Sequence, residues 1–385
     1  MGILKFAATL IAIALVTFTL IIAKQLLIPF VIAFFIWYIT VTLSHWIGEL
    51  PPIKKYFPAW ANTAIAALVI GIILVFIALM IVQNATAMIA SIPKYQQNLD
   101  GLVSRVENAA NFQFIQQIRS KLPSDSASAE STGAFAKFSA NLNIGRLLLG
   151  IVSSIGEVVS SGMMILIYVI FIFFEQAVFP KKMKSLFSKG SAYDRYLRTA
   201  DRINEAMRAY FTVKVAVSAL TATCSYLVLL LIGVDFAFFW AFLIFILNFI
   251  PNIGSLIATV FPATIALVQF DTVLPFFEVV VGIGVIQLIV GNFLEPRLLG
   301  SSLNISSLVV LFALMVWGTI WGITGMVLCV PITVMIMIVL AQFPSTRSAA
   351  LLLSENGELL DDLEKIHEAS EEDDIISQIV DDEED

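Results

Sequence analysis

The residues with the clearest chemical potential are the prolines, glycines, amides and charges that interrupt long apolar runs. They gather in "NFIPNIGS" (248–255) and in "QLIVGNFLEPRLLGSSLN" (287–304). Proline removes a backbone donor, and at membrane depth such breaks persist only where protein buries them or where they line a cavity. The amide side chains offer neutral hydrogen bonds, and the Glu/Arg set offers charge that can change partner. We therefore predict a solute or ion path lined by Asn248, Pro251, Asn252, Gly254, Gln287, Asn292, Glu295, Pro296 and Arg297.

Charged residues in apolar surroundings are costly and are functional candidates by default. Glu295 and Arg297 flank Pro296, and we expect the two charges to compensate each other. An ordinary ion pair in a rigid interfacial turn is the alternative. Glu157, in "LLLGIVSSIGEVVSSGMMIL", is a candidate relay carboxylate for a proton or ion, with a helix-end carboxylate or a structural hydrogen bond as alternatives. Lys214 lies near the end of its run, so we expect its ammonium group to reach the interface and to be structural.

The two interruptions share a frame of Asn-Phe-aliphatic, then Pro, then Gly-Ser, with one extra residue before the second proline. Paired interruptions in corresponding positions are typical of the midplane site of a transporter. The match is short, and it suggests an internal repeat.

A third interruption, "WGTIWGITG" (317–325), combines two tryptophans with three glycines and is followed by a proline. Glycines allow helices to pack closely, and tryptophans between them could gate a pore. This pattern favours a second hypothesis, a passive channel. The gating or packing residues are then Trp317, Gly318, Trp321, Gly322, Gly325 and Pro331.

The residues needed for catalysis are missing from the sequence. It has no G-x-x-x-x-G-K-S/T phosphate loop, and His45 and His367 are its only histidines, so neither a zinc helix nor a Ser/His/Asp set can be built. Cys224 and Cys329 lie in apolar runs and cannot form a metal cluster. We predict that the protein is not an enzyme and uses no cofactor and no metal.

Composition indicates where these residues must sit. Of 385 residues, 59% are hydrophobic and only 13% are charged, whereas soluble domains carry about 25% charge. The surface must therefore face a lipid bilayer. A net charge of −7 argues against nucleic acid as a partner.

Eight apolar stretches approach or exceed the roughly 20 residues that cross a bilayer. Two of them, 236–268 and 306–342, are too long for one straight span and are internally interrupted, so each is a broken or re-entrant segment. The predicted fold is an all-α polytopic transmembrane helix bundle with a small external helical segment. The other stretches are 3–23, 26–47, 60–82, 147–174, 208–233 and 274–292.

Loop charges give the expected orientation and domains. The basic loop 175–208 is placed in the cytoplasm by the positive-inside rule, which puts both termini there as well. Residues 1–82 then form spans 1 to 3, and 83–146 form an external amphipathic segment that either lies on its own bundle or contacts another subunit. Residues 147–342 form the transmembrane core. The tail 343–385 carries fifteen acids against two basic residues and should be solvated, with binding of a cytoplasmic partner as the alternative.

Three blocks resemble a known family. "DFAFFWAFLIFILNFIPNIGSLIA" (235–258), "GNFLEPRLLGSSLNISSLVVLFALMVWGTIWGITGMVLCVPITV" (291–334) and "FFEQAVFPKKM" (173–183) closely resemble the autoinducer-2 exporter family, the PerM-type permeases of bacterial inner membranes. The resemblance covers the layout of nearly all of 1–345. It implies a multi-pass homo-oligomeric permease of the plasma membrane that exports the quorum-sensing signal autoinducer-2, or exchanges sodium for protons, as attributed to other members. The long acidic tail departs from the shorter members.

Together these observations predict a secondary transporter that moves a small polar solute, or coupling ions, by alternating access at the broken helices. The alternatives are a passive homo-oligomeric channel and a Na⁺/H⁺ antiporter. A third hypothesis is a structural membrane protein that recruits a cytoplasmic partner through its tail.

Overall fold

The protein is a bundle of α-helices. A computed structural model describes residues 2–49, 58–110, 161–186, 191–299 and 303–357, and in those ranges it contains helices and one isolated bridge, Ile305 with Ser354, but no strand. The predicted all-α polytopic architecture is confirmed. The acidic end of the tail and Glu157 lie outside the described residues.

Five helical stretches within the described ranges are long and apolar enough to cross a membrane. They lie in α2 (Lys24–Glu49), α4 (Ala59–Ala110), α10 (Ser191–Ile232), α13 (Leu274–Ile289) with the turn that follows it, and α15 (Ser307–Ala341). α1 (Gly2–Ile22) is a further apolar helix. Large side chains such as Leu231, which is 86% exposed, face outward, as expected for helices surrounded by lipid.

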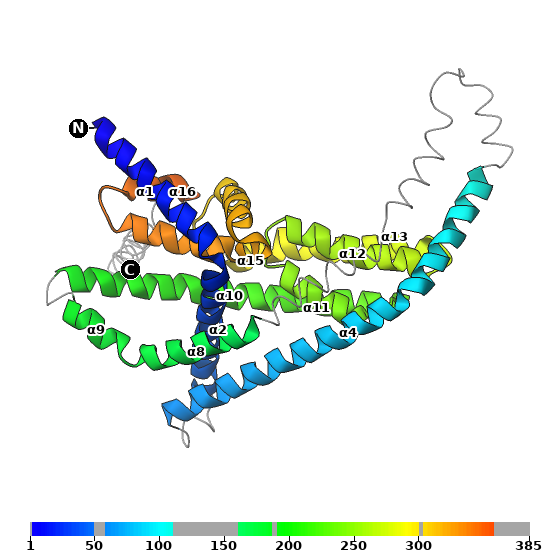
Figure 1. Cartoon of the computed structure of the whole chain (residues 1–385), viewed down its shortest axis with the longest axis horizontal. Coiled ribbons are helices and arrows are strands. Elements are labelled where there is room, and N and C mark those ends of the chain that lie inside the picture. The colour runs from blue at the N-terminus through cyan, green and yellow to red at the C-terminus, as the bar shows by residue number, and fades with distance from the viewer. Residues whose placement is uncertain (1, 50–57, 111–160, 187–190, 300–302, 358–385) are drawn as a thin grey trace, which may run out of the picture.

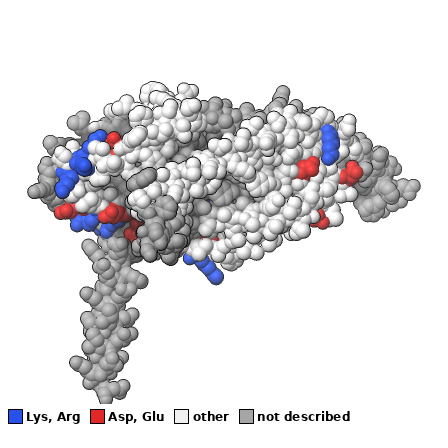
Figure 2. Space-filling view, turned by 90° about the horizontal axis from the view of Figure 1, so that it is seen from below, with Lys and Arg blue, Asp and Glu red and all other residues white. Residues whose placement is uncertain are grey.

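Figure 2 shows that most charged side chains on one face gather toward the two ends of the molecule, and that the surface between them is largely uncharged apart from one basic group at its lower edge. This distribution fits a bundle whose middle lies in hydrocarbon, because charges at the bilayer centre are costly.

One bend was not predicted. α8 (Gly162–Gln176) and α9 (Phe179–Leu186) meet at 57°, and the pair makes a sixth span if it is counted as one. The sequence places an apolar helix before the bend and "FPKKMKSL" after it. A lysine-rich turn of this kind leaves the hydrocarbon for the interface, where its ammonium groups stay hydrated.

The apolar run 236–268 folds into a helical hairpin, here called the first hairpin. α11 (Ala237–Leu247) has 11 residues and is about 16 Å long, too short to cross a bilayer. α12 (Ile253–Gln269) runs back against it. At the open end of the hairpin the Gln269 side chain accepts a hydrogen bond from the backbone N–H of Asp235 (2.6 Å) and donates one to the carbonyl of Gly233 (2.7 Å).

The run 306–342 also turns back on itself, within α15, and forms the second hairpin. Gly322 has φ +63° and ψ −140°, a conformation that breaks the helix into two arms. The start and the end of the hairpin meet through α16 (Arg347–Leu353), because the N–H of Ser306 donates to the carbonyl of Leu353 (3.0 Å). Each interrupted stretch therefore returns, at its end, to the side of the fold on which it began.

α10 is the common support of both hairpins (Figure 1). α10, α11, α12 and α13 form a closed ring in which each helix packs on the next and α13 packs again on α10. The first hairpin opens where α10 ends, after Ile232. The second hairpin begins at Ser306, which follows the segment whose Glu295 contacts Lys214. Its open end therefore lies toward the other end of α10. The hairpins thus enter the bundle from opposite ends.

Candidate functional site

A column of buried polar residues runs along one face of α10. Spacings of three and four residues place side chains on the same side of a helix. Lys214 is 5% exposed, and the three hydroxyl residues that follow it are fully buried. The last member lies 15 residues after the first, a rise of about 22 Å, which is most of a hydrocarbon core. Its members are Tyr210, Lys214, Ser218, Thr221 and Ser225.

The column holds a buried ion pair. The Lys214 Nζ donates to Oε1 of Glu295, and the two side chains are only 6% and 19% exposed. Arg297 was the expected partner of Glu295, but Arg297 is exposed. Side chains that are two residues apart on a helix point in nearly opposite directions, because each residue turns the helix by about 100°. Lys214 was expected to reach the interface and is instead the partner of Glu295.

A π-helical turn positions Glu295. The turn η1 (Val290–Leu294) separates α13 from α14 (Glu295–Leu299), and the N–H of Glu295 bonds to the carbonyl of Val290, five residues back. Pro296 has no N–H, and its ring would clash with a carbonyl four residues earlier in a regular helix. The wider turn accommodates the proline and rotates Glu295 toward α10. π-turns of this kind are frequent at functional sites.

The tip of the first hairpin contacts the column one turn from the ion pair. The Asn248 side chain donates to Oγ of Ser218 at 3.0 Å, and both residues are buried. After Pro251, Asn252 adopts φ +57°, which asparagine tolerates better than most residues. A Cβ on Gly254 would lie 1.8 Å from the Leu247 carbonyl oxygen, so the two arms touch because residue 254 has no side chain.

The tip of the second hairpin uses the same steric device. A Cβ on Gly325 would lie 1.9 Å from the carbonyl oxygen of Trp317. The rings of Trp317 and Trp321 are 5.3 Å apart, and the indole N–H of Trp321 donates to the carbonyl of Leu20 in α1 at 3.2 Å. Gly318 packs against the side chain of Met326 across the bend. The structural counterpart of the first break is therefore 317–325, rather than the segment around Glu295.

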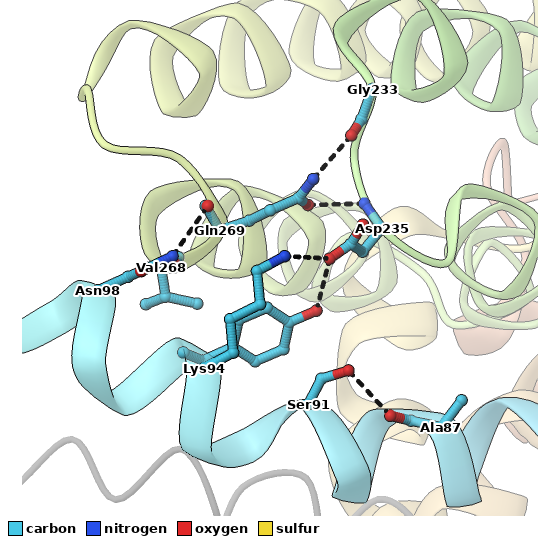
Figure 3. Close-up of polar contacts among 9 residues, drawn as sticks. Ala87, Ser91, Lys94, Asn98, Gly233, Asp235, Val268 and Gln269 are labelled. Atoms are coloured by element: carbon cyan, nitrogen blue, oxygen red, sulfur yellow. Dashed lines mark hydrogen bonds and ion pairs between the residues drawn. The ribbon is translucent and has the colours of Figure 1, made fainter.

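An extension of α4 holds the open end of the first hairpin (Figure 3). α4 continues without interruption from its membrane segment to Ala110. The Tyr95 hydroxyl donates to Asp235 (3.1 Å), the Lys94 ammonium lies 3.8 Å from the same carboxylate, and Asn98 donates to the carbonyls of Val268 and Gln269 (both 3.0 Å). Burial and the Asp235 charge raise the pKa of Tyr95, which keeps its O–H as the donor. This part of the segment predicted to be external lies on its own bundle.

The remaining predicted site residues divide by location. Gln287, on α13, has a buried amide nitrogen, and Pro331 is buried in the second arm of α15. Asn292, Pro296 and Arg297 are exposed on the segment that carries Glu295. Among the described residues no three His, Cys, Asp or Glu side chains are grouped so that they could hold a metal ion.

Sequence reasoning missed the hydroxyl column and the contacts of Asp235. The pattern Lys214, Ser218, Thr221, Ser225, with spacings of four, three and four inside an apolar run, is the observation that could have revealed one polar face.

Comparisons with known proteins agree with this architecture. Residues 10–345 match the family described as AI-2E family transporter. The chain is 34% identical to "AI-2 transport protein TqsA" of Escherichia coli over 209 residues, which cover 54% of this chain and 60% of that protein. It is 29% identical over 336 residues to a protein of Haemophilus influenzae that is named for transport without a stated substrate, covering 86% of this chain and 91% of that protein.

Proposed function

Because the chain belongs to the AI-2E transporter family, whose members are membrane transporters rather than enzymes, we propose that it moves a small polar solute across the bacterial plasma membrane by alternating access. The moving parts are the two hairpins, and the path follows the buried face of α10. Both termini lie in the cytoplasm, and the protein works as a homo-oligomer in the bilayer.

The buried pair of Lys214 and Glu295 is the single observation that carries the proposal. A buried ion pair is weak evidence for stability, because desolvation of the two charges offsets most of their attraction. Charged residues inside membrane bundles instead mark solute paths and proton relays. This pair lies one turn from the Asn248 and Ser218 contact, so movement of the hairpin tip changes the surroundings of both charges.

The solute is proposed from similarity alone. TqsA carries autoinducer-2 in its name, and the match to TqsA spans about half of this chain. Autoinducer-2 or another small polar metabolite is therefore the first solute to assay.

The test is flux in proteoliposomes that contain the purified full-length protein. Glu295→Gln keeps the size of the side chain but removes its charge. We expect it to reduce autoinducer-2 flux at least about tenfold, because Lys214 then has no carboxylate with which to pair and part as the transporter changes state. Arg297→Gln is the matched control, since Arg297 lies two residues away and is exposed. Unchanged flux in a folded Glu295→Gln protein would remove Glu295 from the mechanism.

The same vesicles distinguish the two other hypotheses. A passive channel formed around Gly318, Gly322 and Gly325 would conduct without accumulating solute and without dependence on an ion gradient. A Na⁺/H⁺ antiporter would move sodium when a pH gradient is imposed and would lose that exchange in Glu295→Gln.

A further inference from the structure

Four buried polar groups on α10, α11 and α13 have no hydrogen-bond partner among the described residues. One is the Tyr210 hydroxyl, at the far end of the column, and the other three are Oγ of Ser225, Nε1 of Trp240 and Nε2 of Gln287. Ser225 is 0% and Trp240 1% exposed. Buried polar groups in native proteins are almost always bonded to protein, to water or to a ligand. Each of these groups can therefore still form a hydrogen bond with a polar molecule.

The three groups lie at one level of the bundle. Trp240 precedes Asn248 by eight residues, and because α11 runs antiparallel to α10, the contact of Asn248 with Ser218 places Trp240 beside residue 226. The ring contact between Tyr226 and Phe238 agrees with this register. Both positions adjoin Ser225.

Gln287 lies at nearly the same level. It precedes Glu295 by eight residues, and Glu295 meets Lys214, so Gln287 lies level with residue 222 on the antiparallel α10. Close packing of Gly282 against Val228 supports this register. Gln287 is therefore within one turn of Ser225.

Packing against α12, the fourth helix of the ring, positions the indole ring of Trp240. The ring of Trp240 stacks on Phe261 of α12, with centroids 6.3 Å apart and planes at 21°. Trp240 thus fills space between α11 and α12 while its N–H remains available at the level of Ser225. Donors from three of the four helices in the ring share this level.

We infer that Ser225, Trp240 and Gln287 form a binding site for an oxygen-rich solute that is uncharged or anionic. The inference rests on the proposed transport function and names the solute class for it. The indole and the amide nitrogen are donors only, and a hydroxyl can also donate. Such a set suits carbonyl, hydroxyl or carboxylate oxygens. A metal cation needs several oxygen acceptors instead.

Cysteine reactivity tests whether water and solute reach this level. In a background with Cys224→Ala and Cys329→Ala, Ser225→Cys is compared with Leu229→Cys, one turn away and also 0% exposed. We expect 2-aminoethyl methanethiosulfonate to modify Ser225→Cys at least about tenfold faster, because the thiolate forms only where water enters. D-ribose, a neutral oxygen-rich probe, should slow the reaction, and sodium chloride at equal concentration should not.

Equal, slow modification of both cysteines would overturn the site. Fast modification that sodium slows and D-ribose does not would overturn the assignment of the solute class.

Flux separates this inference from the proposed function. Trp240→Phe keeps an aromatic ring opposite Phe261 and removes the indole N–H together with part of the fused ring, so we expect about a tenfold loss of autoinducer-2 flux. Thr223→Val is the matched control, because Thr223 is exposed and bonds to its own helix at the carbonyl of Ala219. Normal flux in Trp240→Phe together with loss in Glu295→Gln would overturn the binding site and leave the transport proposal intact.

Discussion

The two hairpins solve the same steric problem in different surroundings. In each, a glycine lies directly on a carbonyl of the opposite arm, Gly254 on Leu247 and Gly325 on Trp317. The tip of the first hairpin ends in a polar contact with α10, whereas the tip of the second is aromatic and is bonded to α1.

The open ends also differ. Side chains close the first hairpin, with Asp235 and Gln269 bonded to each other and to α4. Backbone bonds between Ser306 and Leu353 close the second. Side-chain bonds can be exchanged while the backbone stays folded. The difference therefore predicts that, of the two proposed moving parts, the first hairpin opens more readily than the second.

The largest effect is expected at the ion pair beside the first tip. Lys214→Met leaves the Glu295 carboxylate buried without its partner, which should lower the free energy of unfolding by about 3–5 kcal/mol. Denaturation of the purified protein in detergent measures the change. The double variant Lys214→Met with Glu295→Leu should regain most of that stability but not flux. A Lys214→Met protein as stable as wild type would mean that the pair is solvated.

The glycine contacts test whether the two tips are equivalent. Gly254→Ala and Gly325→Ala should each cost about 1–3 kcal/mol, because the new Cβ forces the arms apart. Gly284→Ala is the control, since a Cβ there meets nothing within 4 Å. Thermal unfolding measures all three variants. A neutral Gly254→Ala would show that the first hairpin opens freely and would sharpen the contrast between the tips.

A smaller effect is expected at the open end of the first hairpin. Asn98→Ala removes two hydrogen bonds to α12 and should cost about 1–2 kcal/mol. Hydrogen exchange should increase in 233–270 and stay unchanged in α15. Gln97→Ala, on the exposed side of α4, serves as the control. Equal loosening of both hairpins would contradict the separate roles assigned to them.

The smallest effect is expected at the tip of the second hairpin. Trp321→Phe removes the bond to Leu20 and should cost about 1 kcal/mol, with flux nearly unchanged. Trp317→Phe is the comparison, because it changes the neighbouring aromatic ring and leaves the hydrogen bond from Trp321 to Leu20 in place. A strong loss of flux in either variant would favour the channel hypothesis, in which these tryptophans gate a pore.

The sequence by itself determined the helices and their breaks. Apolar length predicts the spans, and proline and glycine predict the interruptions at 248–255 and 317–325, because both effects act within a few residues of the chain. The sequence also indicated that Asn248, Gln287 and Glu295 carry the chemistry, but roles at these positions remain proposals.

The partners of the buried charges depend on how the helices pack. Glu295 meets Lys214 across 81 residues, and Tyr95 meets Asp235 across 140. A neighbour in sequence, Arg297, looked like the natural partner of Glu295, but helix geometry turns the two side chains apart. Such pairings depend on how the helices pack and on a π-turn that rotates one of them, so no local pattern of residues contains them.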